Sequence, residues 1–426
     1  MCLKWLSFFI DIFVVRKRKK CVIIVTIISI VILIYFITNF SQILSNLKCN
    51  QLKSKALNEI CIEFMRNQFT GHLCHELCQS KTLQLIECPN IDGHNGKDYV
   101  FVGHRYDQQS GQLVDKIVLK ARTLTTFELI GSTSWIKSFA NNRQLIIKAI
   151  NDIMTARFGR LPKQQVISDT NDNQINYFYV NQLIDGLIDG KGDQLNETIL
   201  TNIWLLIQDN EYVLSKIYPN IFPTVVGTCG HFYGVKYADR VIDISYFTPH
   251  YWPLVSQTFE KRIEIGIKIM TFLRDFILID PKLELCDIKF EHLALMSGRL
   301  YLIDSDMIYT KKAVIESIEW ISHCSEDSDC DFIDCKGVCI KDNKCVIEVT
   351  DDDLSRVCRN IFFMGKLYNL IDLGLFSQQT NDLFINKSIQ LIHNHCFNRT
   401  DLISDINAIH LILLKIKSKL SNKSEL

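Results

Sequence analysis

The sequence predicts an α+β fold with two lobes, rich in disulfides and preceded by one transmembrane helix. The chain has 426 residues, too many for one small domain and enough for a two-lobed core. Strand-like and helical segments are mixed along it, and sixteen cysteines are a high count for a reducing compartment. Basic and acidic residues are equal at 47 each, so we expect no nucleic-acid partner.

An apolar segment near the N-terminus predicts a membrane anchor. The basic run "RKRKK" at 16–20 precedes residues 21–40, which include no charge. At about 1.5 Å rise per residue, a helix of this length spans a hydrocarbon core of roughly 30 Å. The alternative, a buried helix of a soluble core, would normally show a polar face. The basic run places residues 1–20 in the cytosol and the rest in the lumen, and no A-x-A-like cleavage site follows. We therefore expect a single-pass type II signal anchor.

The residues beyond this span have features of proteins of the endoplasmic reticulum lumen. Fourteen of the sixteen cysteines follow it, an even number. The chain ends in "KSEL", which is close to the retention signal K-D-E-L. Four N-x-[ST] sequons predict N-glycosylation, at Asn196, Asn386, Asn398 and Asn422. We therefore expect a glycoprotein of the endoplasmic reticulum membrane.

The lumenal cysteines form two clusters, between residues 49 and 88 and at 324–345. Zinc is an alternative for either cluster. The irregular spacings, the lack of a CxxC pair and the lumenal setting favour disulfides, whose connectivity cannot be read from the sequence. We expect a cysteine-rich lumenal segment at 41–81 and a second one at 324–345.

Between the clusters, strand and helix patterns follow one another. Strand-like runs lie at 82–88, 98–106, 113–121, 223–229 and 231–238. Helical periodicity lies at 142–158, 197–217, 259–278 and after residue 350, where "TDDDL" supplies an N-cap and an acidic first turn. We expect an N-lobe at 82–235 and a C-lobe at 236–426.

Two short segments, "DTNDNQIN" at 169–176 and "DGKGDQLN" at 189–196, resemble the loop of an EF-hand. Both place oxygen-bearing side chains at alternate positions, but both lack the Gly of the sharp turn and the closing Glu. The alternative is a pair of Asn- and Asp-rich loops beside helices. We expect a degenerate EF-hand-like insertion at about 165–200 that does not bind calcium tightly.

The stretch "LCDIKFEHLALMSGRLYLIDSDMIYT" at 285–310 predicts two short strands joined by a Gly turn, with acidic residues at their ends. A metal-nucleotide site would place carboxylates there. An exposed hairpin that needs soluble ends would place them there too. The residues alone leave both readings open.

The order of these elements resembles the protein kinase fold. "IVLKAR" resembles the motif of the third strand, which makes Lys120 the residue that binds the nucleotide phosphates and Glu211 its partner. "CDIKFEH" resembles the catalytic loop, with Asp287 to accept the proton of the acceptor hydroxyl and Lys289 to neutralise the transferred phosphoryl. "IDSDM" resembles the metal-binding motif, with Asp304 on Mg²⁺ or Mn²⁺.

The combination of anchor, cysteine-rich segment, insertion and motifs resembles the divergent protein kinase domain 1 family. The motifs that carry this resemblance are "GTCGHFYGV", "CDIKFEH", "LIDSDMIY" and "CDFIDCKGVC". The resemblance implies a kinase-like protein anchored in the endoplasmic reticulum membrane. It also implies ATP with Mg²⁺ or Mn²⁺ as cofactor and a lumenal protein or glycan as partner.

Three departures from the kinase pattern suggest an alternative. The phosphate-covering loop keeps only Gly93 and Gly96, and the position of the second metal-binding Asn is occupied by His292. Imidazole suits softer metals than Mg²⁺. The motif at Asp304 also lacks the usual Phe-Gly. The alternative is therefore a pseudokinase that acts as a binding or scaffold module.

Overall fold

The computed structural model describes residues 44–89, 99–121, 148–150, 152–154, 197–247, 257–348, 350–367, 371–376, 382–398 and 401–424. The predicted tail at 1–20 and anchor at 21–40 lie outside these residues, as does the EF-hand-like insertion as far as residue 196. No helix within the described ranges has both the length and the apolar character needed to cross a membrane. The anchor and the insertion therefore stay predictions.

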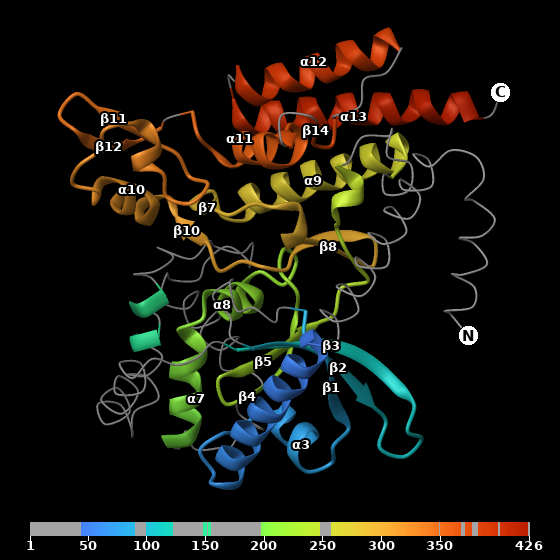
Figure 1. Ribbon diagram of the computed structural model, residues 1–426, viewed down its shortest axis with the longest axis vertical. Helices are drawn as coiled ribbons and strands as arrows, with labels where there is room; N and C mark the ends of the chain where they lie inside the picture. The colour runs from blue at the N-terminus through green and yellow to red at the C-terminus, as the bar shows by residue number, and fades with distance from the viewer. Residues whose placement is uncertain are drawn as a thin grey trace, which may run out of the picture.

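The first half of the described chain contains an antiparallel sheet of five strands (Figure 1). In the order β1-β2-β3-β5-β4, the strands are β1 (Leu83–Glu87), β2 (Tyr99–Tyr106), β3 (Leu113–Ala121), β5 (Phe232–Lys236) and β4 (Val225–Cys229). Each strand lies within a strand-like run of the sequence, so all five predicted strands are confirmed.

The pleat of β3 separates its side chains between two environments. Ile117, Leu119 and Ala121 are fully buried against the helix at 44–65 and helix α3 (His72–Cys78). Val118 and Lys120 point to the opposite face, where they line a cavity. The sheet therefore has one face that forms a core and one that forms part of a site.

The helix predicted at 197–217 is two helices, α7 (Glu197–Ile207) and α8 (Asn210–Ile217), so the prediction of a continuous helix was wrong. Asp209 is the reason. Its carboxylate accepts hydrogen bonds from the backbone N–H groups of Glu211 (3.0 Å) and Tyr212 (3.2 Å), so it caps a new helix. The break places Glu211 in the first turn of α8.

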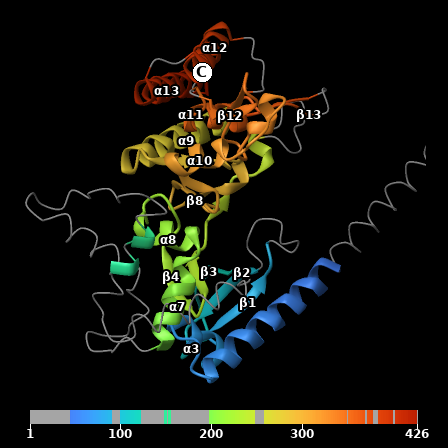
Figure 2. The same ribbon diagram turned by 90° about the vertical axis from the view of Figure 1, so that its left-hand side faces the viewer.

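The second half is built on helix α9 (Phe259–Ile279), which confirms the helix predicted at 259–278. Helix α13 (Leu402–Ser424) packs along α9, and α12 (Leu383–Phe397) packs on α13 (Figures 1 and 2). Helix α11 (Asp353–Val357) begins at the predicted cap, with Asp352 as the N-cap residue. A π-helical turn, Cys358–Phe362, and a hairpin that the sequence pattern did not predict separate α11 from α12. The strands of this hairpin are β13 (Gly365–Leu367) and β14 (Ile371–Leu373).

The hairpin predicted within 285–310 is present. Its strands are β8 (Leu293–Met296) and β9 (Arg299–Leu302), which pair with each other while β6 (Arg240–Val241) pairs with β8. The turn residues Ser297 and Gly298 have φ of 49° and 79°, the left-handed values that a two-residue hairpin loop uses. Strands β7 (Leu283–Leu285) and β10 (Ile308–Thr310) pair with each other. Asp287 follows β7 and Asp304 precedes β10, so both aspartates lie close to the ends of this strand pair in the sequence.

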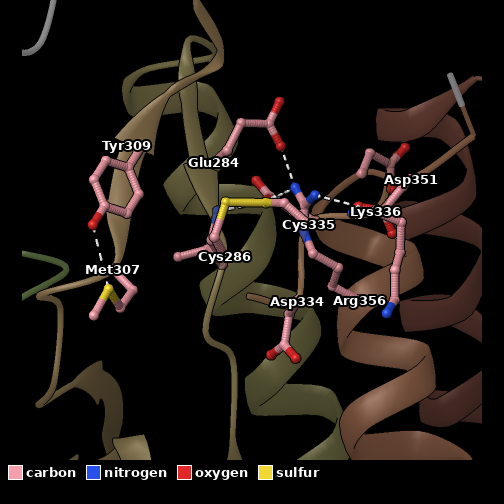
Figure 3. The surroundings of a disulfide bond; sticks show 12 residues. Glu284, Cys286, Met307, Tyr309, Asp334, Cys335, Lys336, Asp351 and Arg356 are labelled. Carbon is pink, nitrogen blue, oxygen red and sulfur yellow. Dashed lines mark hydrogen bonds and ion pairs between the residues drawn. A yellow bond between two sulfur atoms is a disulfide. The ribbon is translucent and has the colours of Figure 1, made fainter. Parts of the chain in front are cut away.

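All fourteen cysteines after the predicted anchor form disulfides, so the disulfide prediction is confirmed and the zinc alternative was wrong. The pairs are Cys49–Cys88, Cys61–Cys78, Cys74–Cys229, Cys286–Cys335, Cys324–Cys339, Cys330–Cys345 and Cys358–Cys396. Residues 311–347, which we call the cysteine-rich module, contain α10 (Lys311–Glu319) and the hairpin of β11 (Gly337–Ile340) and β12 (Lys344–Ile347). The bond Cys286–Cys335 joins this module to the end of β7 (Figure 3).

A buried network of charges joins β7 to α11 (Figure 3). The Arg356 guanidinium forms ion pairs with Asp351 (2.6 Å), Asp353 (2.7 Å) and Glu284, and all four residues are buried. Burial raises the pKa of Glu284 to about 7, and the nearby charge of Asp353 adds to this effect. Arg359 also pairs with Asp351, at 3.1 Å, so two arginines face three carboxylates in this network.

We predict that Glu284 makes the fold less stable as the pH rises. The pKa of Glu284 lies above its ordinary value of 4.5, so the folded chain holds a proton that the unfolded chain releases. The resulting stability is complete below about pH 4.5 and is lost as the pH rises through about 7. The melting temperature of the full chain should therefore fall between pH 5 and pH 8, by less in Glu284→Gln than in the wild type. Glu316→Gln, at an exposed position of α10, is the control and should leave the pH dependence unchanged. An unaltered slope in Glu284→Gln would contradict the prediction.

Candidate active site

Lys120 is placed at the centre of the sheet and forms a buried ion pair with Glu211. The strand register sets Lys120 between Val100 of β2 and Tyr233 of β5. Its ammonium group forms an ion pair with the Glu211 carboxylate and donates to the Ile303 carbonyl oxygen at 2.7 Å. Lys120 is 8% exposed and Glu211 is 1% exposed. A charge buried this deeply requires its partner, so the pair fixes α8 against the sheet.

Three carboxylates converge beside this pair. An oxygen atom from each of Glu211, Asp304 and Asp306 lies within 4.8 Å of the others. Tyr233 lies close enough for these charges to act on it: burial is the main cause that raises the pKa of its hydroxyl, and nearby carboxylates raise it further. Hard oxygen donors at this separation suit Mg²⁺ or Mn²⁺, so the donor chemistry fits a divalent cation.

The residues of the predicted catalytic loop lie next to this cluster of carboxylates. The Lys289 ammonium is 2.8 Å from the Asp287 carboxylate, and the hydrogen bond to Asp287 is the main cause that raises the pKa of Lys289. The side chain of Lys289 is about half exposed, whereas that of Asp287 is mostly covered. A carboxylate and a partly exposed ammonium therefore lie together at the edge of the site.

His292 lies between Asp287 and Asp304, and its contacts determine which ring nitrogen faces the carboxylates that could hold a metal. Nδ1 is 3.1 Å from the Asp287 carbonyl oxygen, an atom that only accepts, so Nδ1 must donate. In the neutral ring the lone pair is then on Nε2, which is 3.7 Å from an Asp304 carboxylate oxygen. His292 can therefore add a nitrogen ligand to the oxygen ligands of a metal.

A cavity of about 480 Å³ extends from these charges toward the connection after β5. Its apolar walls are Val100, Val102, Val118, Val235, Val241 and Ile303. Its polar end is Lys120, Glu211, His292 and Asp304, and Cys88 and Pro89 line its edge after β1. Cavities of this size with apolar walls and a few converging polar groups are typical of small-molecule sites.

The structure brings together six residues predicted from the sequence, Lys120, Glu211, Asp287, Lys289, His292 and Asp304. Gly93 and Gly96 lie outside the described residues. Of the predicted glycosylation sites, Asn398 and Asn422 are exposed and Asn386 is partly buried in α12, while Asn196 lies outside the described part. Glycosylation stays a prediction for all four.

Sequence reasoning missed two acidic residues that complete the site. Asp306 joins the cluster of carboxylates, and the only sequence signal was a second acid in "IDSDM". Asp353, from the segment that predicted only a helix cap, accepts a hydrogen bond from the Leu285 backbone at 2.8 Å. Asp353 thereby fixes the backbone just before the predicted catalytic loop.

The five-stranded sheet, the buried Lys120–Glu211 pair and the acidic hairpin below it define a protein-kinase-like domain. A family model described as the protein-kinase domain of FAM69 matches residues 203–398. A second, described as the N-terminal cysteine-rich ER segment of FAM69, matches residues 13–122. Together the two cover more than two thirds of the chain, so the chain belongs to the FAM69 family. This confirms the resemblance to a divergent, cysteine-rich kinase-like family of the endoplasmic reticulum.

Proposed function

We propose that the chain is a kinase of the endoplasmic reticulum lumen that transfers the γ-phosphoryl group of ATP to a protein or glycan hydroxyl. The observation that supports this most directly is the buried Lys120–Glu211 pair beside the converging Glu211, Asp304 and Asp306 carboxylates. Phosphoryl transfer requires fixed positive charge, a metal on hard ligands and a carboxylate near the acceptor. The cavity provides these groups at one end and apolar walls for a base at the other.

Each charged residue has a specific role in this reaction. Lys120 binds the α- and β-phosphates, and Asp304 with its neighbours holds Mg²⁺ or Mn²⁺, which neutralises phosphate charge when bound. Asp287 accepts the proton of the acceptor hydroxyl as the bond from that oxygen to the γ-phosphorus forms and the bond to the bridging oxygen breaks. Lys289 reaches the transferred group because its ammonium lies beside Asp287 at the open edge.

A binding module without transfer is the second candidate. One observation favours it: the Lys120 ammonium contacts both Glu211 and the Ile303 carbonyl oxygen, which engages two of its three N–H donors. One donor is then left for phosphate. Nucleotide binding and transfer must therefore be measured separately.

We predict different effects for the two aspartates of the hairpin. Asp304→Ala removes a metal ligand, so it should abolish the thermal shift that ATP with Mn²⁺ or Mg²⁺ produces. Asp287→Ala removes only the acceptor-side carboxylate, so the shift should remain while transfer falls by about two orders of magnitude or more. Both variants of the full chain should fold, as judged by retained melting transitions.

The hairpin-cap alternative predicts another pattern. Both changes would then cost a comparable stability of about 1 kcal/mol, with no nucleotide effect in either variant. A wild-type chain that shows no shift with any nucleotide-metal pair would exclude nucleotide-dependent function. A shift without transfer would favour the binding module.

We predict that His292 gives the site a preference for Mn²⁺ over Mg²⁺. Its Nε2 is a softer donor than the carboxylates, and Mn²⁺ accepts nitrogen more readily than Mg²⁺ does. His292→Asn should weaken the Mn²⁺-dependent thermal shift and strengthen the Mg²⁺-dependent one. His323→Asn, at an exposed position away from the site, is the control and should change neither. An equal response of both metals to His292→Asn would show that the imidazole is not a ligand.

We further propose a type II topology, with residues after about 40 in the lumen. The charge-free segment at 21–40 behind "RKRKK" supports it, as does the complete pairing of the later cysteines, since disulfides persist in oxidising compartments. Protease added to sealed microsomes should spare the large C-terminal part, and glycosidase should lower its mass. Digestion of that part without permeabilisation would contradict the topology.

A further inference from the structure

A tight turn of the cysteine-rich module, Phe332–Cys335, contacts the predicted catalytic loop through a hydrogen bond and a disulfide. The two end residues of the turn exchange backbone hydrogen bonds, at 2.9 and 3.0 Å. Cys335 forms the disulfide with Cys286, the residue before Asp287 (Figure 3). The turn is therefore covalently attached next to the predicted catalytic carboxylate, although Asp334 and Asp287 are far apart in the sequence.

Asp334, within this turn, binds the loop on both sides of Asp287. Its backbone N–H donates to the Cys286 carbonyl oxygen at 2.8 Å. Its carboxylate accepts from the Asn360 amide at 2.8 Å, and the same amide nitrogen lies 3.3 Å from the Ile288 carbonyl oxygen. Asp334 thus contacts the residue before Asp287 directly and the residue after it through Asn360.

The backbone of the turn is strained, which indicates that its geometry is imposed by these contacts. Ile333 has φ of 60°, a left-handed value that β-branched residues rarely adopt. Its side chain is 41% exposed, so packing of that side chain does not explain the conformation. Strain of this kind persists where surrounding bonds determine the backbone, and it is frequent at functional sites.

The charges of this region place Lys289 among several carboxylates. Asp287 is the nearest, at 2.8 Å, and the charges of Asp334 and Glu291 also raise the pKa of Lys289. Burial is the main cause that raises the pKa of Asp334, and the charge of Asp287 adds to it, whereas Lys289 and Arg359 lower it. Asp334, Asp287 and Lys289 therefore lie within electrostatic reach of one another.

We propose that Asp334 is a positioning residue of the active site, which fixes the loop around Asp287 and thereby the position of Lys289, two residues further along the same loop. The effect of Asp334 on phosphoryl transfer rests on the proposed kinase function. The effect of Asp334 on Lys289 does not depend on that function. Residues of the cysteine-rich module would therefore shape the acceptor side of the site, 47 positions beyond the catalytic loop in the sequence.

The first test measures Lys289 directly and needs no nucleotide. In Asp334→Asn the side-chain oxygen can still accept from Asn360, but the negative charge is gone. The pKa of Lys289 should fall, so acetic anhydride at a fixed pH near 8 should label Lys289 about two- to threefold faster in the full chain. Asp331→Asn is the matched control, because Asp331 is in the same module and its carboxylate pairs with Lys336. It should leave the labelling of Lys289 unchanged.

The second test measures transfer. Asp334→Asn should lower the rate of phosphoryl transfer from ATP with Mn²⁺ by about tenfold while the nucleotide-induced thermal shift is kept, because misplaced groups reduce transfer more than binding. Asp331→Asn should leave both readouts at their wild-type values.

The outcomes separate the two proposals. Equal labelling of Lys289 in Asp334→Asn and wild type would overturn the positioning role, whether or not the wild type is active. Faster labelling with unchanged transfer would overturn the role in transfer. A wild type without any nucleotide-dependent shift or transfer, in which labelling still responds to Asp334→Asn, would refute the kinase function and leave the placement of Lys289 by Asp334 supported.

Discussion

The rest of the structure depends on the burial of one ammonium group, that of Lys120. The free-energy cost of burying an isolated charge in this position would be too high. The ammonium group is therefore paired with the Glu211 carboxylate from α8 and with the Ile303 carbonyl oxygen from the segment after β9. These partners come from the two halves of the molecule. The ion pair joins two elements of the first half, and the hydrogen bond to Ile303 joins the ammonium group to the second half, so the cavity is lined by residues of both halves. Removing one partner would leave the other charged and buried, which typically costs 3–5 kcal/mol.

The other side of the site is held by different means. Asp287 lies in a loop with little regular structure, between β7 and β8. Three contacts restrict this loop: the disulfide Cys286–Cys335, the hydrogen bond from the Leu285 N–H to the Asp353 carboxylate, and the hydrogen bond from the Asn360 amide to the Ile288 carbonyl oxygen. Each of these contacts comes from residues after β10. The disulfide-bonded cysteine-rich module thus takes part in forming the site.

The sequence predicted the parts of the fold and site that short-range patterns encode. The strands around Lys120, the hairpin before Asp304 and the long helix at 259–278 have clear periodicities, and their positions are confirmed. The helix break at Asp209 was missed because the apolar periodicity continues across it. The helix is interrupted only because the Asp209 side chain caps a new helix. Asp334 and Asp353 were missed for another reason: their roles depend on a disulfide and a buried network that join segments far apart in the sequence. No local pattern records such a connection.

The balance of charge in the site would limit how the proposed nucleotide enters it. Carboxylates of Glu211, Asp304, Asp306 and Asp287 face the ammonium groups of Lys120 and Lys289, so negative groups outnumber positive ones among these residues before any ligand binds. The phosphates of ATP would add further negative charge to a region with restricted access to water. Electrostatic repulsion in such a setting is strong, because the effective dielectric constant is low. Free ATP would therefore be repelled, whereas ATP that arrives with a divalent cation gives the carboxylates a partner. If the chain binds ATP as proposed, the metal would be required for binding itself, and the acidic cluster would select the metal-nucleotide complex as a unit.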